Sequence, residues 1–379
     1  MPEDSYCRQN EVGHRIAAMK AAVLNSCPGD LEIEDVAIDK PGPREVLIQT
    51  AAAGLCHSDL HFLEAKYPAQ VPVVLGHESA GVVEAVGSDV QYVKPGDHVI
   101  TCLSVFCGHC EECLTGHMSL CQNPETRRAP GSAARLTRPD GSTMNQFLNL
   151  SSFAEQMLVH EHAIVKINPE MPLDRACLLG CGATTGLGAV QNTAKVEPGS
   201  TVAVIGCGGI GLNAVQGAYL AGASRIIAVD MLDSKLELAK VFGATDTVNA
   251  SDGMAVQKVI EMTGGGVHYS FEAIGLKIAA EQAFAMLRRG GTATVIGMIP
   301  IGDTVELPGF AFLGEKKIQG SAMGSNRFRV DMPRYVDLYL QGRLKLDELV
   351  SARIPIEEIN DGFKAMKTGE VARSVVMFD

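Results

Sequence analysis

The chain has 379 residues, of which 46% are hydrophobic and 20% are charged, and its formal net charge is −12. This length allows two domains, and the composition is typical of a globular enzyme. Because nucleic acids and anionic membranes attract basic surfaces, the negative charge argues against either as a partner. No apolar run approaches the roughly 20 residues that cross a bilayer.

The first residues of the chain are polar and lack the apolar stretch of a secretion signal. We predict that residues 1–18 form a disordered extension ahead of a core that begins near Met19. Eleven cysteines without an export signal suggest a reducing compartment. We therefore expect a cytoplasmic protein whose cysteines bind metal, act as nucleophiles or pack in the core.

Short strand-like runs separated by turns dominate the first half of the chain. Strands are predicted at 45–50, 79–86 and 98–100, and Lys94-Pro-Gly-Asp97 indicates a turn. Residues 122–147 are rich in Arg, Gly, Ser and Pro and are predicted to form a surface loop. This half of the chain therefore indicates an irregular, β-rich domain.

Strand-like and helix-like segments alternate after residue 182. Continuous apolar strands in such an alternation predict a parallel sheet with helices on both faces, and hence an α/β fold with a doubly wound sheet. The predicted strands are 201–205, 225–229, 246–248, 268–271 and 292–296, and the predicted helices are 209–221, 234–242, 278–287, 333–340 and 356–366.

A glycine-rich motif lies between the first of these strands and the first helix. Gly206-Cys-Gly-Gly-Ile-Gly211 fits the dinucleotide-binding pattern G-x-G-x-x-G. In that pattern Gly206 permits the tight turn, Gly208 lets the backbone approach the pyrophosphate, and Gly211 lets helix and strand pack closely. The helix that begins at Gly209 and Ile210 would face the phosphates with its N-terminus.

Asp230 ends the next predicted strand, about 20 residues after the glycine motif. A carboxylate at this position accepts hydrogen bonds from the adenosine ribose and repels a 2′-phosphate, so NAD is favoured over NADP. Lys235 is a second candidate contact to the ribose, and a solvated helix lysine explains its spacing equally well.

Four cysteines cluster at residues 107, 110, 113 and 121. Disulfides, free core thiols and an iron–sulfur cluster are alternatives, but compartment, polar neighbours and unusual spacing for a ferredoxin count against them. We predict that Cys107, Cys110, Cys113 and Cys121 bind one structural Zn²⁺ in a closed shell of four sulfurs.

Cys56, His77 and Cys181 form a second possible metal set, scattered along the chain. Two cysteines and one histidine with an open fourth position are the ligands of a catalytic zinc, and alcohol dehydrogenase is the standard example of this set. Sequence spacing alone leaves open whether the three residues meet.

Taken together, these segments resemble the zinc-dependent medium-chain alcohol dehydrogenases over nearly the whole chain from about Met19. Their order and separations agree with the family as well as their residues. The matching segments are Gly54-Leu-Cys-His-Ser-Asp59, Gly76-His-Glu-Ser-Ala-Gly81, Lys94-Pro-Gly-Asp97, the four-cysteine run, Gly180-Cys-Gly182, Gly206 to Gly211 and Phe271-Glu-Ala-Ile-Gly275.

The resemblance implies two zinc ions per subunit. Cys56, His77 and Cys181 would bind the catalytic zinc, and Glu78 would lie close to it. Asp59 would accept a hydrogen bond from the His77 ring and fix its tautomer.

The resemblance also assigns contacts to NAD beyond the glycine motif. His57 and Arg373 would contact the pyrophosphate, and Thr185 would lie near the nicotinamide. The remaining positions assigned to the cofactor are Gly209, Ile210, Ile274, Ile296 and Met298.

The implied reaction is the reversible oxidation of a primary alcohol to an aldehyde by hydride transfer to NAD. Zinc would lower the pKa of the alcohol oxygen, and the proton would leave through the Ser58 hydroxyl, the cofactor ribose and His61. The family places pocket residues at Tyr67, Leu103, Met298 and Met323. Leu103, where a bulky aromatic residue is common, predicts an aromatic, terpenoid or medium- to long-chain alcohol rather than ethanol.

Two other functions compete with this prediction. A formaldehyde dehydrogenase that acts on a glutathione-type thiol adduct is compatible with His57. A zinc- and NAD-binding protein without turnover is the alternative from another class, and the retention of Ser58 and His61 argues against it. The presence of both metal sets excludes a zinc-free relative of the quinone reductases.

The resemblance finally implies the domain organisation. A GroES-like catalytic domain would comprise residues 19–182 and 321–379, and a Rossmann NAD-binding domain residues 183–320. We expect a homodimer or homotetramer with a small-molecule alcohol or aldehyde as its other partner.

Overall fold

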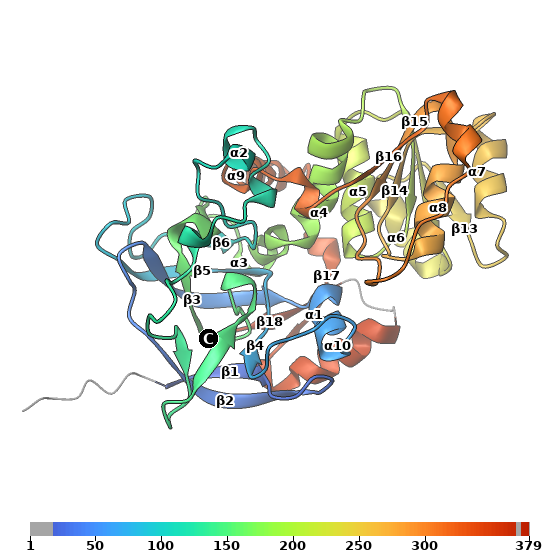
Figure 1. Ribbon diagram of the computed structural model, residues 1–379. Coiled ribbons are helices and arrows are strands. Elements are labelled where there is room, and N and C mark those ends of the chain that lie inside the picture. Colours follow the sequence, from blue (N-terminus) through green and yellow to red (C-terminus); the bar gives the residue numbers. More distant parts are fainter. Residues whose placement is uncertain (1–17, 369–372, 379) are drawn as a thin grey trace, which may run out of the picture.

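The computed structural model describes residues 18–368 and 373–378, which form two lobes (Figure 1). Of the predicted extension 1–18, residues 1–17 lie outside the described residues. Ala18 instead begins the first strand, β1 (Ala18–Leu24), because its backbone already pairs with Ala37, while the buried core starts at Met19 as expected. None of the helices in the described part of the chain has the length and apolar character that a membrane span requires.

A closed barrel makes up one side of the first lobe, which we call the barrel lobe. Its strands follow the order β1, β2 (Leu31–Ile38), β7 (Leu136–Thr137), β8 (Thr143–Gln146) and β4 (Val73–Val74). β7 and β8 correct the prediction of a plain surface loop at 122–147. Arg135 explains the difference, since its guanidinium is buried against the Glu45 carboxylate at 2.7 Å and holds this segment on the barrel lobe.

The barrel lobe also contains a seven-stranded sheet in which the end of the chain lies beside its beginning. β18 (Arg373–Met377) pairs with β3 (Glu45–Gly54) and also with β17 (Val350–Ile354), so both C-terminal strands belong to this sheet. Its strands are β10 (Ile164–Lys166), β6 (His98–Thr101), β5 (Ser79–Val86), β3 (Glu45–Gly54), β18 and β17 (Val350–Ile354), with β9 (Gln156–His160) also paired to β3.

A six-stranded parallel sheet forms the second lobe, which we call the parallel-sheet lobe. The strand order, β13-β12-β11-β14-β15-β16, reverses direction between β11 and β14, as in a doubly wound sheet. The strands are β11 (Thr201–Ile205), β12 (Arg225–Asp230), β13 (Asp246–Asn249), β14 (Val267–Glu272), β15 (Leu287–Val295) and β16 (Lys317–Gly320).

Helices flank the parallel sheet (Figure 1). They are α5 (Gly209–Leu220), α6 (Asp233–Val241), α7 (Ala255–Thr263) and α8 (Lys277–Ala285). The sequence prediction missed α7, a nine-residue helix that buries Ala255 and Val259 and ends at Gly264 in the left-handed region. The predicted helix 278–287 ran too far, because Leu287 already pairs with Val267 at the start of β15.

The remaining helices connect the sheets or cover the barrel lobe. The α-helices are α1 (His57–Leu63), α2 (Glu111–Leu114), α3 (Leu173–Ala176), α4 (Gly182–Gly188), α9 (Phe328–Leu340) and α10 (Ile359–Thr368), and η6 (Ala189–Ala194) is a π-helix. The short 3₁₀ helices are η1 (Met118–Leu120), η2 (Pro124–Thr126), η3 (Phe147–Asn149), η4 (Glu161–Ala163), η5 (Cys177–Gly180), η7 (Gly309–Gly314), η8 (Met323–Ser325), η9 (Asp347–Leu349) and η10 (Ile356–Glu358).

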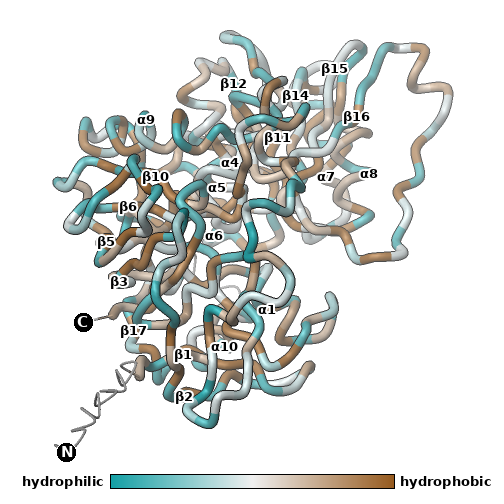
Figure 2. Tube along the Cα trace, turned by 60° about the vertical axis from the view of Figure 1, so that its left-hand side comes forward, coloured by the Kyte–Doolittle hydropathy of each residue, from teal (hydrophilic) through white to brown (hydrophobic). Residues whose placement is uncertain are grey.

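The chain passes between the lobes near α4 and near η8. These two segments touch, since a Cβ on Gly188 would overlap the Gly324 backbone. The long connection between β15 and β16 runs along the outer edge of the parallel-sheet lobe (Figure 2). The domain boundaries expected at residues 182/183 and 320/321 stay a prediction. They are consistent with the two places where the chain passes between the lobes.

Candidate active site

The three scattered residues predicted to bind the catalytic zinc meet in the structure. The Sγ atoms of Cys56 and Cys181 and a ring nitrogen of His77 all lie within 4.8 Å of one another, and all three side chains are buried. A tetrahedral zinc places sulfur and nitrogen ligands about 3.5 to 3.8 Å apart. The trio therefore fits three corners of a zinc site, with the fourth left for substrate.

Local backbone structure brings each of these residues to the site. Cys56 is the N-cap of α1, and Cys181 lies between η5 and α4. His77 follows β4 through Gly76, whose φ of 90° lies in the left-handed region that favours glycine. The corner at Gly76 turns the chain so that His77 faces the two cysteines.

Asp59 fixes the orientation of the His77 ring. Its Oδ1 lies 3.1 Å from His77 Nδ1 and also accepts the Gly76 amide at 3.2 Å. Because Nδ1 is engaged by the carboxylate, Nε2 is the ring nitrogen free to bind a metal. This is the arrangement that the predicted role of Asp59 requires.

Electrostatics favours a thiolate at the trio. The Cys181 thiol donates to Cys56 and holds the pKa of Cys56 well below its usual value, while the positive charge of Arg373 acts in the same direction. Since zinc binds the thiolate form of cysteine, the site is prepared for the metal.

Glu78 is fully buried beside the trio and is held by two groups. Its Oε2 accepts the Gly182 amide at 3.0 Å and lies 3.6 Å from Arg373 Nη2. Oε1 is buried and has no hydrogen-bond partner in the described part of the chain. Burial raises the pKa of Glu78 to about 7, against the opposing charge of Arg373. A carboxylate with one free oxygen here fits the predicted position near the metal.

The four clustered cysteines surround a common point at the tip of a loop. The Cys110 Sγ lies 3.4 Å from that of Cys113 and 3.7 Å from that of Cys121, and the Cys107 and Cys113 Sγ atoms are 3.9 Å apart. Zn–S bonds of about 2.3 Å put the corners of a tetrahedron about 3.8 Å apart. Backbone amides of His109 and Cys110 donate to Cys107 Sγ, as a thiolate would require. The set fits a closed zinc shell.

The glycine turn has the geometry that its motif predicts. Gly206 has a φ of 93°, and a Cβ on Gly211 would collide with the Gly206 carbonyl oxygen. A Cβ on Gly208 would instead point into open space at the start of α5, where a phosphate can approach the backbone. The Arg373 guanidinium lies beside Gly209 and Gly182 and donates to the Leu55 carbonyl at 2.8 Å. Arg373 thus links the turn to the trio.

Asp230 lies against the glycine turn. Its two carboxylate oxygens accept the amides of Cys207 at 2.8 Å and Leu232 at 3.1 Å, which fixes the side chain at the end of β12. Lys235 follows on α6 and is partly buried. His57 is exposed at the start of α1, and surrounding protein lowers its pKa, with the charge of Arg373 adding to the effect. These positions suit one bound dinucleotide.

The residues predicted near the nicotinamide line the region between the lobes. Thr185 Oγ1 lies 3.5 Å from Met323 Sδ. Ile274 lies against the glycine turn, where a Cβ on Gly206 would meet its side chain at 2.5 Å, and Ile296 is buried just after β15. Leu103, expected in the substrate pocket, packs partly on the core between β3, β5 and β9.

Ser58 and His61, the predicted proton relay, lie one turn apart on α1. Ser58 Oγ is 3.3 Å from Met298 Sδ, and the buried His61 Nδ1 has no hydrogen-bond partner among the described residues. Residues at i and i+3 share a helix face. Burial lowers the pKa of His61, and the charge of Lys66 adds to this effect. The relay itself stays a prediction.

Two residues join segments of the site in ways the sequence did not predict: Glu272 was not named as a site residue, and Tyr67 was expected only in the substrate pocket. Glu272, fully buried at the end of β14, accepts the amides of Ile274 and Gly275 with one oxygen and that of Gly297 with the other. Tyr67 donates to the Ile299 carbonyl at 2.9 Å. The available signal for Glu272 was a carboxylate at the end of a predicted strand, within Phe271-Glu-Ala-Ile-Gly275. No sequence pattern pairs Tyr67 with Ile299.

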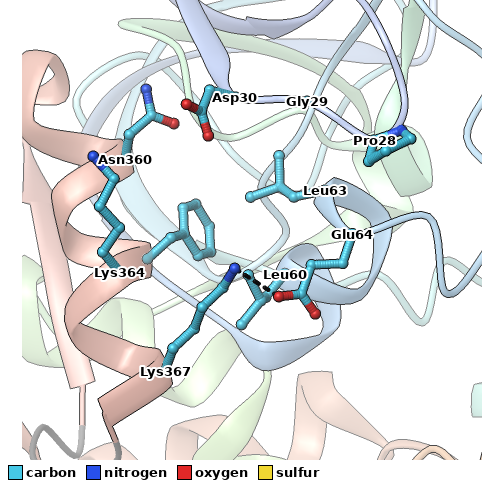
Figure 3. A pocket seen from close by; sticks show the side chains of 10 residues that line it. Pro28, Gly29, Asp30, Leu60, Leu63, Glu64, Asn360, Lys364 and Lys367 are labelled. Atoms are coloured by element: carbon cyan, nitrogen blue, oxygen red, sulfur yellow. Dashed lines mark ion pairs between the residues drawn. The ribbon is translucent and has the colours of Figure 1, made fainter.

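A pocket of about 400 Å³ lies behind α1 and is separate from this site (Figure 3). Leu60 and Leu63 line it, and at 100° per residue they point away from the face of Ser58 and His61. Three of its four charged side chains are paired, Glu64 with Lys367 at 2.6 Å and Lys364 with Asp361 at 2.9 Å. We therefore assign no part of the chemistry to it.

Comparisons with known proteins agree with this geometry. Residues 42–169 match the family described as alcohol dehydrogenase GroES-like domain, and residues 209–341 match the zinc-binding dehydrogenase family. S-(hydroxymethyl)glutathione dehydrogenase of Saccharomyces cerevisiae is 38% identical over 370 residues, covering 95% of this chain and 96% of that protein. Alcohol dehydrogenase class-3 of Cereibacter sphaeroides is 39% identical over 373 residues, covering 95% and 99%.

Solved structures share the whole architecture. Benzyl alcohol dehydrogenase of Acinetobacter calcoaceticus is 35% identical, with a TM-score of 0.89, and the match covers 96% of this chain and 99% of that one. The predicted GroES-like and Rossmann α/β fold class is thereby confirmed. The chain belongs to the zinc-dependent medium-chain alcohol dehydrogenase family and is an NAD-dependent oxidoreductase that uses zinc and NAD.

Proposed function

We propose that the chain oxidises the alcohol group of a thiol adduct of the S-(hydroxymethyl)glutathione type. The general reaction, oxidation of an alcohol, is supported by one observation: Cys56, His77 and Cys181 are buried together beside the glycine turn. The substrate class rests on the relatives, which are named S-(hydroxymethyl)glutathione dehydrogenase or alcohol dehydrogenase class-3 at 38% to 40% identity. They favour this alternative over the simple primary alcohol that the sequence prediction placed first.

An aromatic primary alcohol is the second candidate. Its support is the benzyl alcohol dehydrogenase structure, which matches nearly the full chain at a TM-score of 0.89. A leucine at position 103, where the family commonly has a bulky aromatic residue, is compatible with an aromatic ring in the pocket.

The residues of the trio would hold the catalytic zinc, and the four clustered cysteines would hold the structural one. When bound, zinc supplies a Lewis acid that lowers the pKa of the alcohol oxygen, and NAD supplies the hydride acceptor. Asp59 orients His77 for this task. Glu78 would lie near the metal, and its Oε1 has no hydrogen-bond partner among the described residues.

Two residues on α1, Ser58 and His61, would remove the proton of the substrate alcohol. The Ser58 hydroxyl can accept the substrate proton and donate its own. His61, whose pKa is below the usual value because of burial, is largely neutral near pH 7 and therefore able to accept that proton on the way to solvent. The absence of a partner at His61 Nδ1 within the described residues leaves that atom free for the transfer.

The cofactor would lie along the glycine turn and α1. Backbone amides at the start of α5 and the Arg373 guanidinium supply positive charge for the pyrophosphate, and the His57 ring can donate a hydrogen bond to it. Asp230, held by two backbone amides, presents its carboxylate to the adenosine ribose. Thr185, Ile274, Ile296 and Met298 would enclose the nicotinamide end.

A substrate panel followed by NADH absorbance tests the proposal. We expect formaldehyde to be oxidised only when glutathione is added, with a kcat/KM above those for benzyl alcohol, cinnamyl alcohol and ethanol. Cys56→Ala should abolish every one of these activities. A benzyl alcohol value well above that for the adduct would select the second candidate. Binding of NADH without turnover of any alcohol would instead revive the non-catalytic alternative.

We also propose a homodimer or homotetramer assembled through the parallel-sheet lobe. β16 is an edge strand, and the connection before it exposes Ile301 at 75%, Phe310 at 85% and Leu313 at 79%. Such a patch indicates a protein interface. Light scattering should give a multiple of the 40.2 kDa chain, and Phe310→Glu should shift it toward the monomer.

A cytoplasmic location is part of the proposal as well. All ten cysteines within the described residues are free thiols, and six of them belong to the two metal sets. Thiols that bind zinc must stay reduced, which a reducing compartment ensures.

A further inference from the structure

Two contacts join α1 and the turn after it to the connection that follows β15. The Tyr67 hydroxyl donates to the Ile299 carbonyl at 2.9 Å, and Ser58 Oγ lies 3.3 Å from Met298 Sδ. The first residue of each pair belongs to the barrel lobe and the second to the parallel-sheet lobe. Neither contact involves α4 or η8, where the chain itself crosses between the lobes. The two contacts therefore hold the lobes together independently of the covalent connections.

Tyr67 is fixed in place by the barrel lobe. Its ring stacks on the His61 ring with centroids 5.9 Å apart and planes 16° apart, and it also packs on Phe62 at 5.9 Å. The amides of Lys66 and Tyr67 both donate to the His61 carbonyl, which ends α1 in a tight turn. These contacts within the barrel lobe therefore fix the direction of the Tyr67 hydroxyl, whether or not it contacts the other lobe.

The acceptor is fixed just as firmly by the parallel-sheet lobe. Glu272 accepts the Gly297 amide at 3.1 Å and the Gly275 amide at 2.6 Å, and so ties the segment after β15 to the turn after β14. Gly275 also packs closely on the Met298 backbone, where a Cβ would clash with the carbonyl group. The Ile299 carbonyl thus moves with the sheet that carries the glycine turn.

We propose that Tyr67 is a positioning residue whose hydrogen bond holds the two lobes together beside the proposed cofactor site and slows release of the reduced cofactor. The inference rests on the proposed function only in placing NADH between the glycine turn and α1. A cofactor enclosed there leaves when the lobes separate. Because both ends of the Tyr67–Ile299 hydrogen bond are held rigidly, separation must break it.

Stopped-flow measurement of NADH dissociation in Tyr67→Phe tests this role. The substitution removes one oxygen atom and leaves the stacking on His61 and Phe62. NADH bound to the zinc-loaded enzyme is displaced by excess NAD, and its fluorescence is followed. We expect dissociation to be about 2- to 10-fold faster, the range that one neutral hydrogen bond contributes. Tyr67→Leu, which also removes the ring, should release NADH at least as fast.

Tyr219→Phe is the matched control, since Tyr219 is 63% exposed on α5 and should leave the rate unchanged. An unchanged dissociation rate in folded, zinc-loaded Tyr67→Phe would overturn the proposal. Loss of the fold or of zinc in that variant would also overturn it, because the hydroxyl would then serve stability. No alcohol is present in the experiment, so the result is independent of which substrate the enzyme takes.

Discussion

At the scale of single residues, buried polar side chains organise the site. Asp59, Glu78 and Glu272 are fully buried, and each accepts backbone amides as well as facing a group of the site. Burying a carboxylate costs free energy unless it is paired and hydrogen-bonded. We infer that these carboxylates hold the predicted zinc ligands and the predicted cofactor-binding segments in fixed positions.

Asp59→Asn tests this idea at the trio. The substitution keeps the shape of the side chain but removes the charge that engages His77 Nδ1. Changes in such outer residues weaken zinc binding about 10- to 100-fold. We expect the catalytic zinc to be lost at a correspondingly lower chelator concentration, as measured by metal analysis after dialysis. Asp89→Asn, an exposed carboxylate bonded to Ser88, is the control and should retain its zinc. Equal zinc retention in both variants would contradict the assigned role.

At the scale of elements, the 122–147 segment shows how one ion-pair network determines the path of the chain. Glu45 at the start of β3 pairs with Arg128 at 2.6 Å and with Arg135 at 2.7 Å. Removing one member of a buried pair leaves an unpaired charge and costs about 3 to 5 kcal/mol. The network therefore keeps β7 and β8 on the barrel, where composition alone indicated a loop.

The same network predicts an acid-sensitive fold. The two arginines, acting against burial, hold the pKa of Glu45 at about 2, below the ordinary 4.5. Since the folded state binds this proton less readily, its contribution to stability is complete above pH 4.5 and is lost as the pH falls toward 2. His160, opposite Glu45 on β9, has a pKa of about 3 because of burial, and so stability also falls between pH 6.5 and 3.

Thermal unfolding of Glu45→Gln across pH 7 to 3 separates these two contributions. We expect a Tm several degrees below that of the natural sequence at pH 7, reflecting about 3 kcal/mol. The difference between the two proteins should shrink below pH 4.5, while the decline from pH 6.5 to 4.5 should remain in both. Glu34→Gln serves as the control, because its pair with Arg138 is partly exposed and contributes about 1 kcal/mol or less. A constant difference at all pH values would contradict the assignment.

At the scale of the whole molecule, we propose that the two metal sets have separate tasks. The four cysteines lie in one short stretch around α2, whereas the trio draws on three distant segments. A closed shell of sulfurs leaves no position for a substrate, so the first set can contribute only stability. We therefore expect catalysis to depend on the trio and on the segments of both lobes that carry the proposed cofactor contacts.

Paired cysteine substitutions test this division. Cys113→Ser should lower the zinc content from two ions to one per chain and lower the Tm, with turnover lost only as the protein unfolds. Cys56→Ser should abolish NADH formation while the Tm falls by less. Metal analysis, thermal unfolding and steady-state rates measured on the same preparations compare the two. Full turnover by folded Cys56→Ser would contradict the assignment of the catalytic zinc.

The sequence by itself determined the features that depend on local order. The glycine turn, the four-cysteine cluster, the alternation of strands and helices and Asp230 at a strand end all follow from residues close together in the chain. The predicted helix over 209–221 and strand over 201–205 agree with α5 and β11 to within one residue, because apolar periodicity and glycine positions fix them.

Only the tertiary structure decided what depends on distant contacts. The convergence of Cys56, His77 and Cys181, the return of β18 to β3 and the hydrogen bond from Tyr67 to Ile299 join residues tens to hundreds of positions apart. Chain spacing carries no information about such pairs, since packing and buried hydrogen bonds select them. The family resemblance anticipated the trio, but the contacts of Tyr67 and Glu272 and the strands within 122–147 emerged only from the fold.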